Sequence, residues 1–259
     1  MTLPGPNIPV TPSFRLDGRR ALVTGAGGGI GLAAAAALAE AGAAVTLVAR
    51  TAATIEAGAA AIRATGAIAE AAVLDVTDLA RVTSFFRERP AFNVLVNNAG
   101  TNRPMPMTQV SEADYDAVLN LNLKAAFFVA QACVIRLLEA KDTGSLIHIG
   151  SQMGHVGGPS RSLYCASKWA LEGMNKSFAL DLAASAIRSN TIAPTFIETP
   201  LTKPFLADEA FKASVLEKIK LGRVGRVEDL MGAVLYLACD ASALVTGTSL
   251  VVDGGWTAE

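Results

Sequence analysis

The sequence predicts an α/β fold in which helices cover both faces of a sheet of seven parallel strands. From Arg19 onward, short apolar runs alternate with longer helical stretches, which is the pattern of repeated strand-helix-strand units. No linker interrupts the alternation, and 259 residues are enough for one domain with a large core. We therefore expect a single doubly wound domain over residues 14–259, preceded by a flexible proline-rich arm at residues 1–13.

The expected strands are short apolar runs, as is typical of strands buried inside a parallel sheet. They cover residues 20–25, 43–50, 69–76, 92–100, 144–151, 187–194 and 248–255. The first two helices are expected over residues 31–42 and 51–66. They end at Gly42 and Gly66, because glycine readily adopts the left-handed conformation that closes many helices.

The second half of the chain contains one long helix and one irregular insertion. Ser111 and Asp114 can form the capping box of a helix that runs to Ala140. The regular alternation stops at about residues 195–222, where two prolines precede a charged helical piece at residues 208–220. An insertion between the sixth and seventh strands is a place where such a fold can build a lid over its substrate.

Composition excludes several classes of protein. The chain is 51% hydrophobic and 17% charged, and its net charge of −1 disfavours nucleic acid or an anionic membrane as a partner. The three cysteines lack a CxxC pair and only two histidines are present, so we expect neither a disulfide framework nor a metal site. The first residues have no basic start and no apolar core, so we expect no secretory signal and a cytoplasmic location.

A glycine-rich turn, Val23–Gly31, follows the first expected strand and opens the first helix. Its spacing is Thr-Gly-x-x-x-Gly-x-Gly, formed by Thr24, Gly25, Gly29 and Gly31. Such glycines let a phosphate approach main-chain N–H groups at a helix N-terminus, as in the Rossmann dinucleotide-binding fold. A tight turn without a ligand is the alternative interpretation.

The end of the second strand should contact the adenosine ribose of the cofactor. Arg50 lies there, and no acidic residue occurs between Val45 and Ile55. A guanidinium can bind a 2′-phosphate, so NADP(H) is favoured, with NAD(H) as the alternative cofactor. Arg50 could instead stack on the adenine or face solvent.

Tyr164 and Lys168 are four residues apart in a helical segment, so their side chains project from one face. A cation beside a phenol lowers the pKa of the phenol, which suits proton transfer. The alternative is ordinary packing of the tyrosine ring and the lysine stem on a helix surface.

The Tyr-x-x-x-Lys pair occurs together with other motifs in the order and spacing of the short-chain dehydrogenase/reductase family, which this sequence resembles from Phe14 to Trp256. These motifs are Thr24–Gly31, Asp75, Asn97–Gly100, Asn122, Ser151, Tyr164 with Lys168, and Ser249–Trp256.

The resemblance implies catalytic roles for four residues. Tyr164 is the expected general acid, and the base in the reverse direction, while Lys168 lowers its pKa and binds the nicotinamide ribose. Ser151 is expected to donate to the same substrate oxygen. Asn122 is expected at an irregular point of the long helix, where it holds a water that links Lys168 to solvent.

The resemblance also implies which residues bind the cofactor. They are Gly25, Gly29, Ile30, Gly31, Arg50, Asp75, Val76, Asn98, Ala99, Gly100, Tyr164, Lys168, Pro194, Ile197 and Thr199. Asp75 is expected to accept from the adenine amino group and Thr199 to bind the carboxamide. The sequence departs from the family at Ala193–Thr195, where "APT" replaces the usual proline-glycine step.

Gln152 and His155 follow Ser151 closely and are the candidate substrate-binding residues, because an amide and an imidazole suit hydroxyl groups or a carboxylate. The alternative is that they are loop residues that face solvent. Arg103 and Arg161 are further candidates for an anionic substrate, although a surface role is favoured for either one.

Taken together, the resemblance implies an NAD(P)-dependent oxidoreductase that interconverts a secondary alcohol and a ketone. The nearest subgroups are the sugar-acid and polyol dehydrogenases, such as gluconate 5-dehydrogenases, and the 3-oxoacyl carrier-protein reductases. Gln152 and His155 favour a sugar, sugar acid or polyol, with reduction of a 3-oxoacyl thioester as the alternative. A non-catalytic dinucleotide sensor is a rival that predicts a damaged proton relay. A homotetramer built on the long helices and the last strand is also implied.

Overall fold

The computed structural model describes residues 8–258. Its strands form one parallel sheet of seven in the order β3-β2-β1-β4-β5-β6-β7. They are β1 (Arg20–Thr24), β2 (Ala44–Ala49), β3 (Ala69–Val73), β4 (Val94–Asn97), β5 (Gly144–Ile149), β6 (Ile187–Pro194) and β7 (Ser249–Val252). Each lies inside a predicted strand segment, so the predicted α/β fold class is confirmed. The strand order reverses between β1 and β4, and open α/β sheets bind ligands at the carboxyl ends of such strands.

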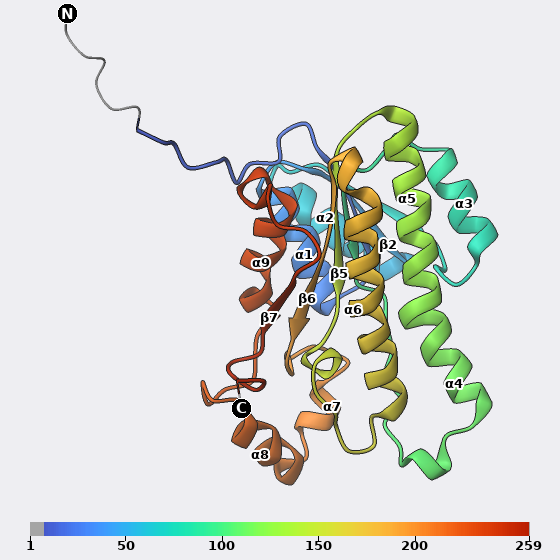
Figure 1. Ribbon diagram of the computed structural model, residues 1–259, viewed down its shortest axis with the longest axis vertical. Coiled ribbons are helices and arrows are strands. Elements are labelled where there is room, and N and C mark those ends of the chain that lie inside the picture. The colour runs from blue at the N-terminus through green and yellow to red at the C-terminus, as the bar shows by residue number, and fades with distance from the viewer. Residues whose placement is uncertain (1–7, 259) are drawn as a thin grey trace, which may run out of the picture.

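Helices cover both faces of the sheet (Figure 1). They are α1 (Gly29–Glu40), α2 (Ala52–Ala64), α3 (Leu79–Arg87), α4 (Glu112–Leu119), α5 (Ala126–Ala140), α6 (Ser162–Leu182), α7 (Lys203–Leu206), α8 (Glu209–Lys218) and α9 (Glu228–Ala238). Helices α1, α2 and α9 pack on one face, and α3, α5 and α6 on the other. Gly42 and Gly66 have φ values of 104° and 89°, as expected for residues that end helices.

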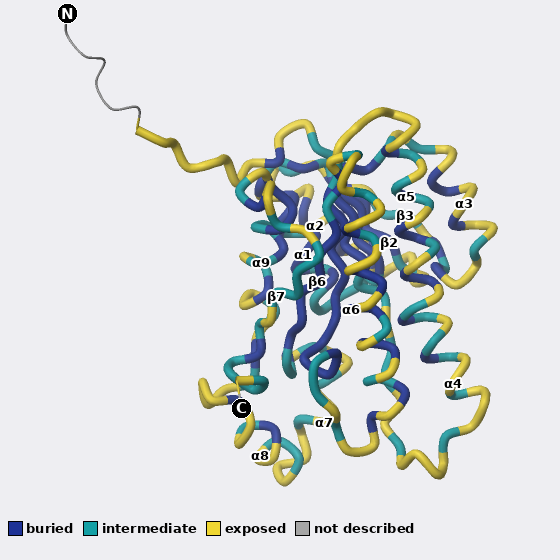
Figure 2. The backbone as a smooth tube through the Cα atoms, in the orientation of Figure 1, coloured by how far each residue is buried: buried dark blue, intermediate teal, exposed yellow. Residues whose placement is uncertain are grey.

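The sheet separates two apolar clusters because successive side chains of a strand point to opposite faces. Along β1, Ala21 and Val23 join the cluster under α1 and α9, whereas Leu22 joins the cluster under α3 and α5. The second cluster includes the aromatic rings of Phe86 and Phe92. Figure 2 shows the strands as the most deeply buried part of the chain.

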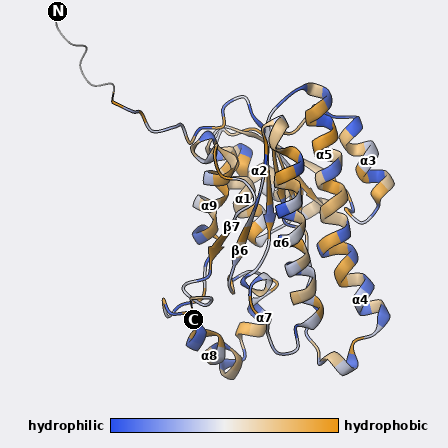
Figure 3. Ribbon diagram, viewed as in Figure 1, coloured by the Kyte–Doolittle hydropathy of each residue, from blue (hydrophilic) through white to orange (hydrophobic). Residues whose placement is uncertain are grey.

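The long helix predicted over residues 111–140 is interrupted. Ser111 and Asp114 form the predicted capping box of α4, but residues 120–125 form a π-helical turn before α5 begins. The whole stretch Glu112–Ala140 is long and apolar enough to cross a membrane (Figure 3). However, Val129, Ala130 and Leu137 pack in the core, so α5 is a core helix.

The segment after β6 contains α7 and α8, which lie beyond the carboxyl end of β6 (Figure 1). Helix α8 corresponds to the charged piece predicted at residues 208–220, and the Asp208 side chain caps it by accepting from the N–H groups of Ala210 and Phe211. Of the predicted arm at residues 1–13, residues 1–7 lie outside the described residues, and residues 8–13 are exposed without regular secondary structure.

Candidate active site

The turn between β1 and α1 depends on glycine at defined positions. Gly25 and Gly29 have φ values of 64° and 54°, and a Cβ atom on Gly31 would lie 2.5 Å from the carbonyl oxygen of Gly25. Asn98, just after β4, fixes this turn by donating to the carbonyl oxygens of Thr24 (3.0 Å) and Gly25 (3.2 Å). The N-terminus of α1 follows directly, so its free N–H groups are available to bind an anion.

A cavity of about 470 Å³ extends from this turn to the helix that carries Tyr164. Thirteen of the predicted site residues line it: Gly25, Gly29, Ile30, Asn98, Ala99, Gly100, Ser151, Gln152, Tyr164, Lys168, Pro194, Ile197 and Thr199. Gly28 also lines it, and a Cβ atom there would meet no other atom within 4 Å. Bare backbone beside a helix N-terminus fits the pyrophosphate of a dinucleotide.

Arg50, Asp75 and Val76 do not line this cavity. They follow β2 and β3, whose carboxyl ends are adjacent because Ala49 pairs with Val73. Hydrogen bonds from the hydroxyl and N–H groups of Thr77 (2.7 and 2.9 Å) hold the pKa of Asp75 below its ordinary value, and the Arg50 guanidinium acts in the same direction. The three residues thus form a separate edge, where an adenosine moiety would extend from the cavity.

Tyr164 and Lys168 lie on the first turns of α6 and both line the cavity. The Lys168 Nζ atom donates to the carbonyl oxygen of Ile149 (2.7 Å) and lies 5.6 Å from the centroid of the Tyr164 ring. Burial lowers the pKa of Lys168 to about 8, although the nearby Glu172 carboxylate opposes this shift. An ammonium group is therefore held beside the phenol in a desolvated setting.

The pKa of Tyr164 differs from the sequence expectation. Burial raises the pKa of this phenol above its ordinary value, while the Ser151 hydroxyl and the Arg161 guanidinium act in the opposite direction. The expectation rested on Lys168 and on the positive ring of the bound cofactor, and it did not include the cost of removing the phenolate from water. In the protein without a nucleotide, Tyr164 is therefore protonated at neutral pH, which is the form that a general acid requires.

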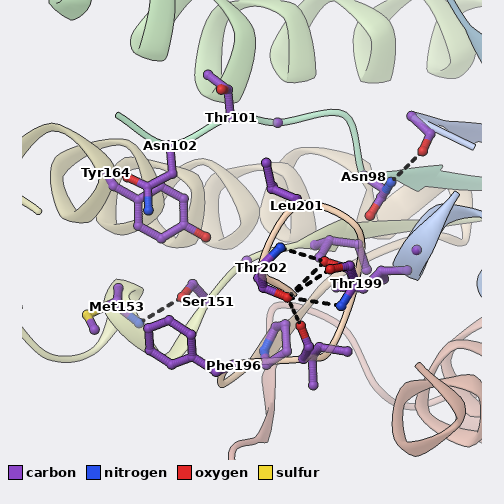
Figure 4. A pocket seen from close by; sticks show the side chains of 18 of the residues that line it. Asn98, Thr101, Asn102, Ser151, Met153, Tyr164, Phe196, Thr199, Leu201 and Thr202 are labelled. Carbon is purple, nitrogen blue, oxygen red and sulfur yellow. Dashed lines mark hydrogen bonds between the residues drawn. The ribbon is translucent and has the colours of Figure 1, made fainter. Parts of the chain in front are cut away.

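Ser151 follows β5 and begins a short 3-10 turn, Gln152–Gly154. Its hydroxyl donates to the Gln152 Oε1 atom (2.8 Å) and accepts from the N–H of Met153 (3.1 Å). Figure 4 shows Ser151 and Tyr164 at one end of the cavity, away from Asn98. The serine hydroxyl is thus positioned near the phenol, and it has a partner that it can exchange for a substrate oxygen.

Asn122 lies in the π-helical turn, so the expected irregular point is present. Its side-chain amide donates to the carbonyl oxygen of Thr101 (2.9 Å) and the hydroxyl of Ser167 (3.0 Å), and it accepts from the N–H of Thr101 (2.8 Å). The amide therefore ties the segment after β4 to α6. Asn122 does not line the cavity and forms no hydrogen bond with Lys168.

The two candidate substrate residues are placed differently. Gln152 lines the cavity and is 2% exposed. His155 lies outside the cavity lining, because the 3-10 turn directs it toward β7. Its Nε2 atom is 2.9 Å from the Ser249 hydroxyl and 3.7 Å from a carboxylate oxygen of Glu172.

The two candidate arginines also differ. Arg103 forms an ion pair with Asp114 (2.6 Å) and does not line the cavity. Arg161 lines the cavity and is 9% exposed, so the surface role expected for it is wrong. The only sequence signal for this difference is that Arg161 lies three residues before Tyr164, one helical turn away on the same face.

Several lining residues were not singled out by sequence reasoning. Among them, Asn102 follows β4, and four come from the segment after β6: Phe196, Leu201, Thr202 and Phe205. Thr202 fixes the start of that segment, since its hydroxyl accepts from the N–H of Thr199 (2.9 Å) and donates to the carbonyl oxygen of Ile197 (2.5 Å). Within residues 8–258, no group of three His, Cys, Asp or Glu residues is placed to hold a metal ion.

Comparison with known proteins gives matches over nearly the whole chain. A protein-family model described as enoyl-(acyl carrier protein) reductase matches residues 25–257. Gluconate 5-dehydrogenase of Gluconobacter oxydans is 37% identical over 248 residues, covering 94% of this chain and 96% of that protein.

Solved structures also resemble this chain over nearly its whole length. A putative 2-deoxy-D-gluconate 3-dehydrogenase from Agrobacterium tumefaciens with bound NADP has a TM-score of 0.91 and 40% identity, covering 95% of this chain and 99% of that chain. A gluconate 5-dehydrogenase from Burkholderia cenocepacia in complex with NADP and tartrate has a TM-score of 0.91 and 38% identity, covering 95% and 98%.

The fold, the glycine turn and these matches agree with the family that the sequence motifs resemble. The protein is an NAD(P)-dependent oxidoreductase and belongs to the short-chain dehydrogenase/reductase family.

Proposed function

We propose that this protein interconverts a secondary alcohol and a ketone on a sugar, a sugar acid or a polyol. One observation carries the proposal: a single cavity joins the glycine turn to Ser151, Tyr164 and Lys168. Hydride transfer is supplied by the nicotinamide when it is bound, so the protein has to position the substrate and move one proton.

In the reductive direction, the Tyr164 hydroxyl donates its proton to the substrate carbonyl oxygen as the carbonyl carbon accepts hydride. The Ser151 hydroxyl exchanges Gln152 for the same oxygen and stabilises the charge that develops there. The Lys168 ammonium, 5.6 Å from the Tyr164 ring centroid, favours the phenolate that remains. In the oxidative direction the phenolate is the base.

NADP(H) is the proposed cofactor, with NAD(H) as the alternative. The α1 N-terminus and the turn of Gly25, Gly29 and Gly31 would hold the pyrophosphate. Arg50 would bind the 2′-phosphate, because it is exposed beside the expected adenosine site. Two similar solved structures contain NADP, which supports this choice. The remaining proposed contacts are Ile30, Asp75, Val76, Asn98, Ala99, Gly100, Pro194, Ile197 and Thr199.

We also propose a homotetramer in the cytoplasm. Large apolar side chains are exposed on the long helices and on β7, where the interfaces are expected: Phe127, Ile135, Leu138, Trp169, Leu180 and Val251. Exposed apolar side chains grouped on packed helices are typical of subunit interfaces. Light scattering of the purified protein tests the assembly.

The test of the proposed function is a screen of sugars, sugar acids, polyols and 3-hydroxyacyl thioesters as alcohols, each with NADP+ and NAD+. We expect turnover with at least one sugar, sugar acid or polyol. A 3-oxoacyl thioester is the second candidate, because apolar side chains of Met153, Phe196, Leu201 and Phe205 also line the cavity. Exclusive turnover of the thioesters would favour that candidate, and no turnover in the whole screen would contradict both.

A further inference from the structure

The Arg161 guanidinium is buried at the substrate end of the cavity without an acceptor. Arg161 is 9% exposed and lines the cavity. Its Nη1 atom is buried with no hydrogen-bond partner, and within residues 8–258 the guanidinium forms no hydrogen bond or ion pair. A buried charge without a partner is destabilising, so it marks a place where a partner is missing.

The surroundings of Arg161 identify the sign of the charge that the missing partner carries. Among the described residues that line the cavity, the charged side chains are Arg161 and Lys168, and none is acidic. Lys168 already donates to the carbonyl oxygen of Ile149. The Phe205 ring lies beside the Arg161 guanidinium, with its centroid 6.0 Å from Cζ, and offers no hydrogen-bond acceptor of its own. An anionic group is therefore the group that the cavity lacks.

The position of Arg161 relative to the reacting atoms is also defined. It immediately precedes α6 and lies one turn before Tyr164, and its charge partly opposes the rise that burial causes in the pKa of Tyr164. An anion bound by Arg161 would thus belong to the molecule whose carbonyl oxygen Tyr164 protonates, and not to the pyrophosphate beside the glycine turn.

Two further polar atoms in the cavity lining are buried without hydrogen-bond partners. They are Asn102 Oδ1 and Thr195 Oγ1. An amide oxygen can only accept a hydrogen bond, so Asn102 requires a donor such as a hydroxyl group. Figure 4 shows Asn102 at the same end of the cavity as Tyr164 and Ser151. The substrate end therefore presents an unpaired cation together with an unpaired acceptor.

We propose that the substrate is a hydroxylated carboxylic acid whose carboxylate pairs with Arg161 and whose hydroxyl donates to Asn102 Oδ1. This inference rests on the proposed function and narrows its substrate class to aldonic and ketoaldonic acids. A carboxylate is preferred to a phosphate because one planar guanidinium matches its two oxygens, and no second free cation is present among the described lining residues. Neutral polyols would leave the guanidinium unpaired.

The decisive experiment compares carboxylates with their uncharged analogues in wild type, Arg161→Met, Arg161→Lys and Arg103→Met. Aldonates, D-gluconate included, are paired with the matched alditols, such as D-glucitol, and oxidised with the preferred cofactor. Arg103→Met is the matched control, because this nearby arginine is paired with Asp114 outside the cavity lining. The measured quantity is the aldonate-to-alditol ratio of kcat/KM.

We expect this ratio to fall by about 100-fold in Arg161→Met, mainly through KM of the aldonate. Arg161→Lys should recover part of it, and Arg103→Met should keep the wild-type ratio. If Arg161 acts only by tuning Tyr164, Arg161→Met will lower kcat equally for both compounds and shift its pH profile. That result would overturn the proposed carboxylate contact.

Failure of the inference and failure of the proposed function have different signatures. If alditols or 3-hydroxyacyl thioesters are oxidised as efficiently as aldonates, the inference is wrong and the oxidoreductase function stands. If nothing in the panel turns over, calorimetric titration of each aldonate into the protein with NADP+ decides the inference. We expect Kd to be at least about tenfold weaker in Arg161→Met, and no binding of any aldonate to wild type would overturn it.

Discussion

The two ends of the active-site cavity are built in opposite ways. At the nucleotide end, the hydroxyl of Thr24 accepts from the N–H groups of Asn98 and Ala99, and the Asn98 amide donates to Thr24 and Gly25. At the substrate end, Arg161 and Asn102 contain buried polar atoms without partners. The first set is complete without a ligand, and the second is not.

We infer from this difference that the nucleotide end supplies affinity for the cofactor and that the substrate end supplies specificity for the substrate. Groups that satisfy one another form the same rigid surface whatever is bound, so the nucleotide end depends on backbone shape. Unpaired groups favour only a ligand that supplies the missing donors and acceptors, and they disfavour analogues that lack them. We therefore expect substitutions at the two ends to change different measured quantities.

The largest effect is expected at Tyr164, at the substrate end of the cavity. Tyr164→Phe keeps the ring and removes the transferable proton, so kcat should fall by about 10³-fold. Fluorescence titration should show nearly unchanged NADPH affinity, and circular dichroism should show an unchanged fold. A folded Tyr164→Phe protein with near wild-type turnover would contradict the acid/base assignment.

The buried ammonium group of Lys168 should lower the free energy of unfolding, because burial favours its uncharged form. Its pKa is about 8 in the folded protein and 10.5 ordinarily. Between these pH values the unfolded chain binds more protons, so wild-type stability should rise with pH relative to Lys168→Met. We expect a relative gain of about 1 to 3 kcal/mol, complete near pH 10.5 and absent below pH 8.

Unfolding by guanidinium chloride at a series of pH values measures this gain in stability. Lys176→Met, an exposed lysine two turns later on α6, is the matched control and should show no such difference from wild type. A pH-independent difference between wild type and Lys168→Met would contradict the depressed pKa.

At the nucleotide end, stability and NADPH binding should depend on the close packing of the glycine turn. Gly31→Ala would place Cβ 2.5 Å from the Gly25 carbonyl oxygen and 2.6 Å from Asn98 Nδ2. We expect a loss of about 2 kcal/mol in the free energy of unfolding, with weaker NADPH binding. Gly28→Ala is the control, because its Cβ would meet nothing within 4 Å, and its unfolding free energy should change by less than about 0.5 kcal/mol. Equal effects would show that close packing of the turn is not the cause.

The smallest effect is expected at Arg50, which is exposed. Arg50→Ala should lower the NADP+-to-NAD+ ratio of kcat/KM by about tenfold, since only the proposed 2′-phosphate contact would be lost. Steady-state kinetics with both cofactors measure the ratio, and Arg87→Ala, another exposed arginine, should leave it unchanged. An unaltered ratio in Arg50→Ala would mean that another group selects the cofactor.

The sequence predicts the strands and the glycine turn well because both depend on local pattern. The strand Arg20–Thr24 has an apolar centre, Ala21–Val23, and is followed by glycines whose spacing fixes the turn, so no distant contact is needed to recognise it. The placement of Arg161 and His155 depends instead on the 3-10 turn after Ser151 and on the segment that carries Phe205. The spacing of residues along the sequence predicts neither placement.

The raised pKa of Tyr164 was missed for a related reason. The spacing from Lys168 shows that a cation is near, but the cost of desolvation depends on everything packed around the phenol. Whether the pKa of a buried group is raised or lowered therefore depends on the whole folded structure.

The π-helical turn at residues 120–125 has a consequence for the phase of the helix around it. One extra residue in a turn rotates everything downstream by about 100° relative to an uninterrupted α-helix. The contacting faces of α4 and α5 are therefore offset. Deleting one residue would bring them into register and turn the Asn122 amide away from Thr101, whereas substitutions would keep the offset. The length of this segment, as well as its composition, is thus part of the active site.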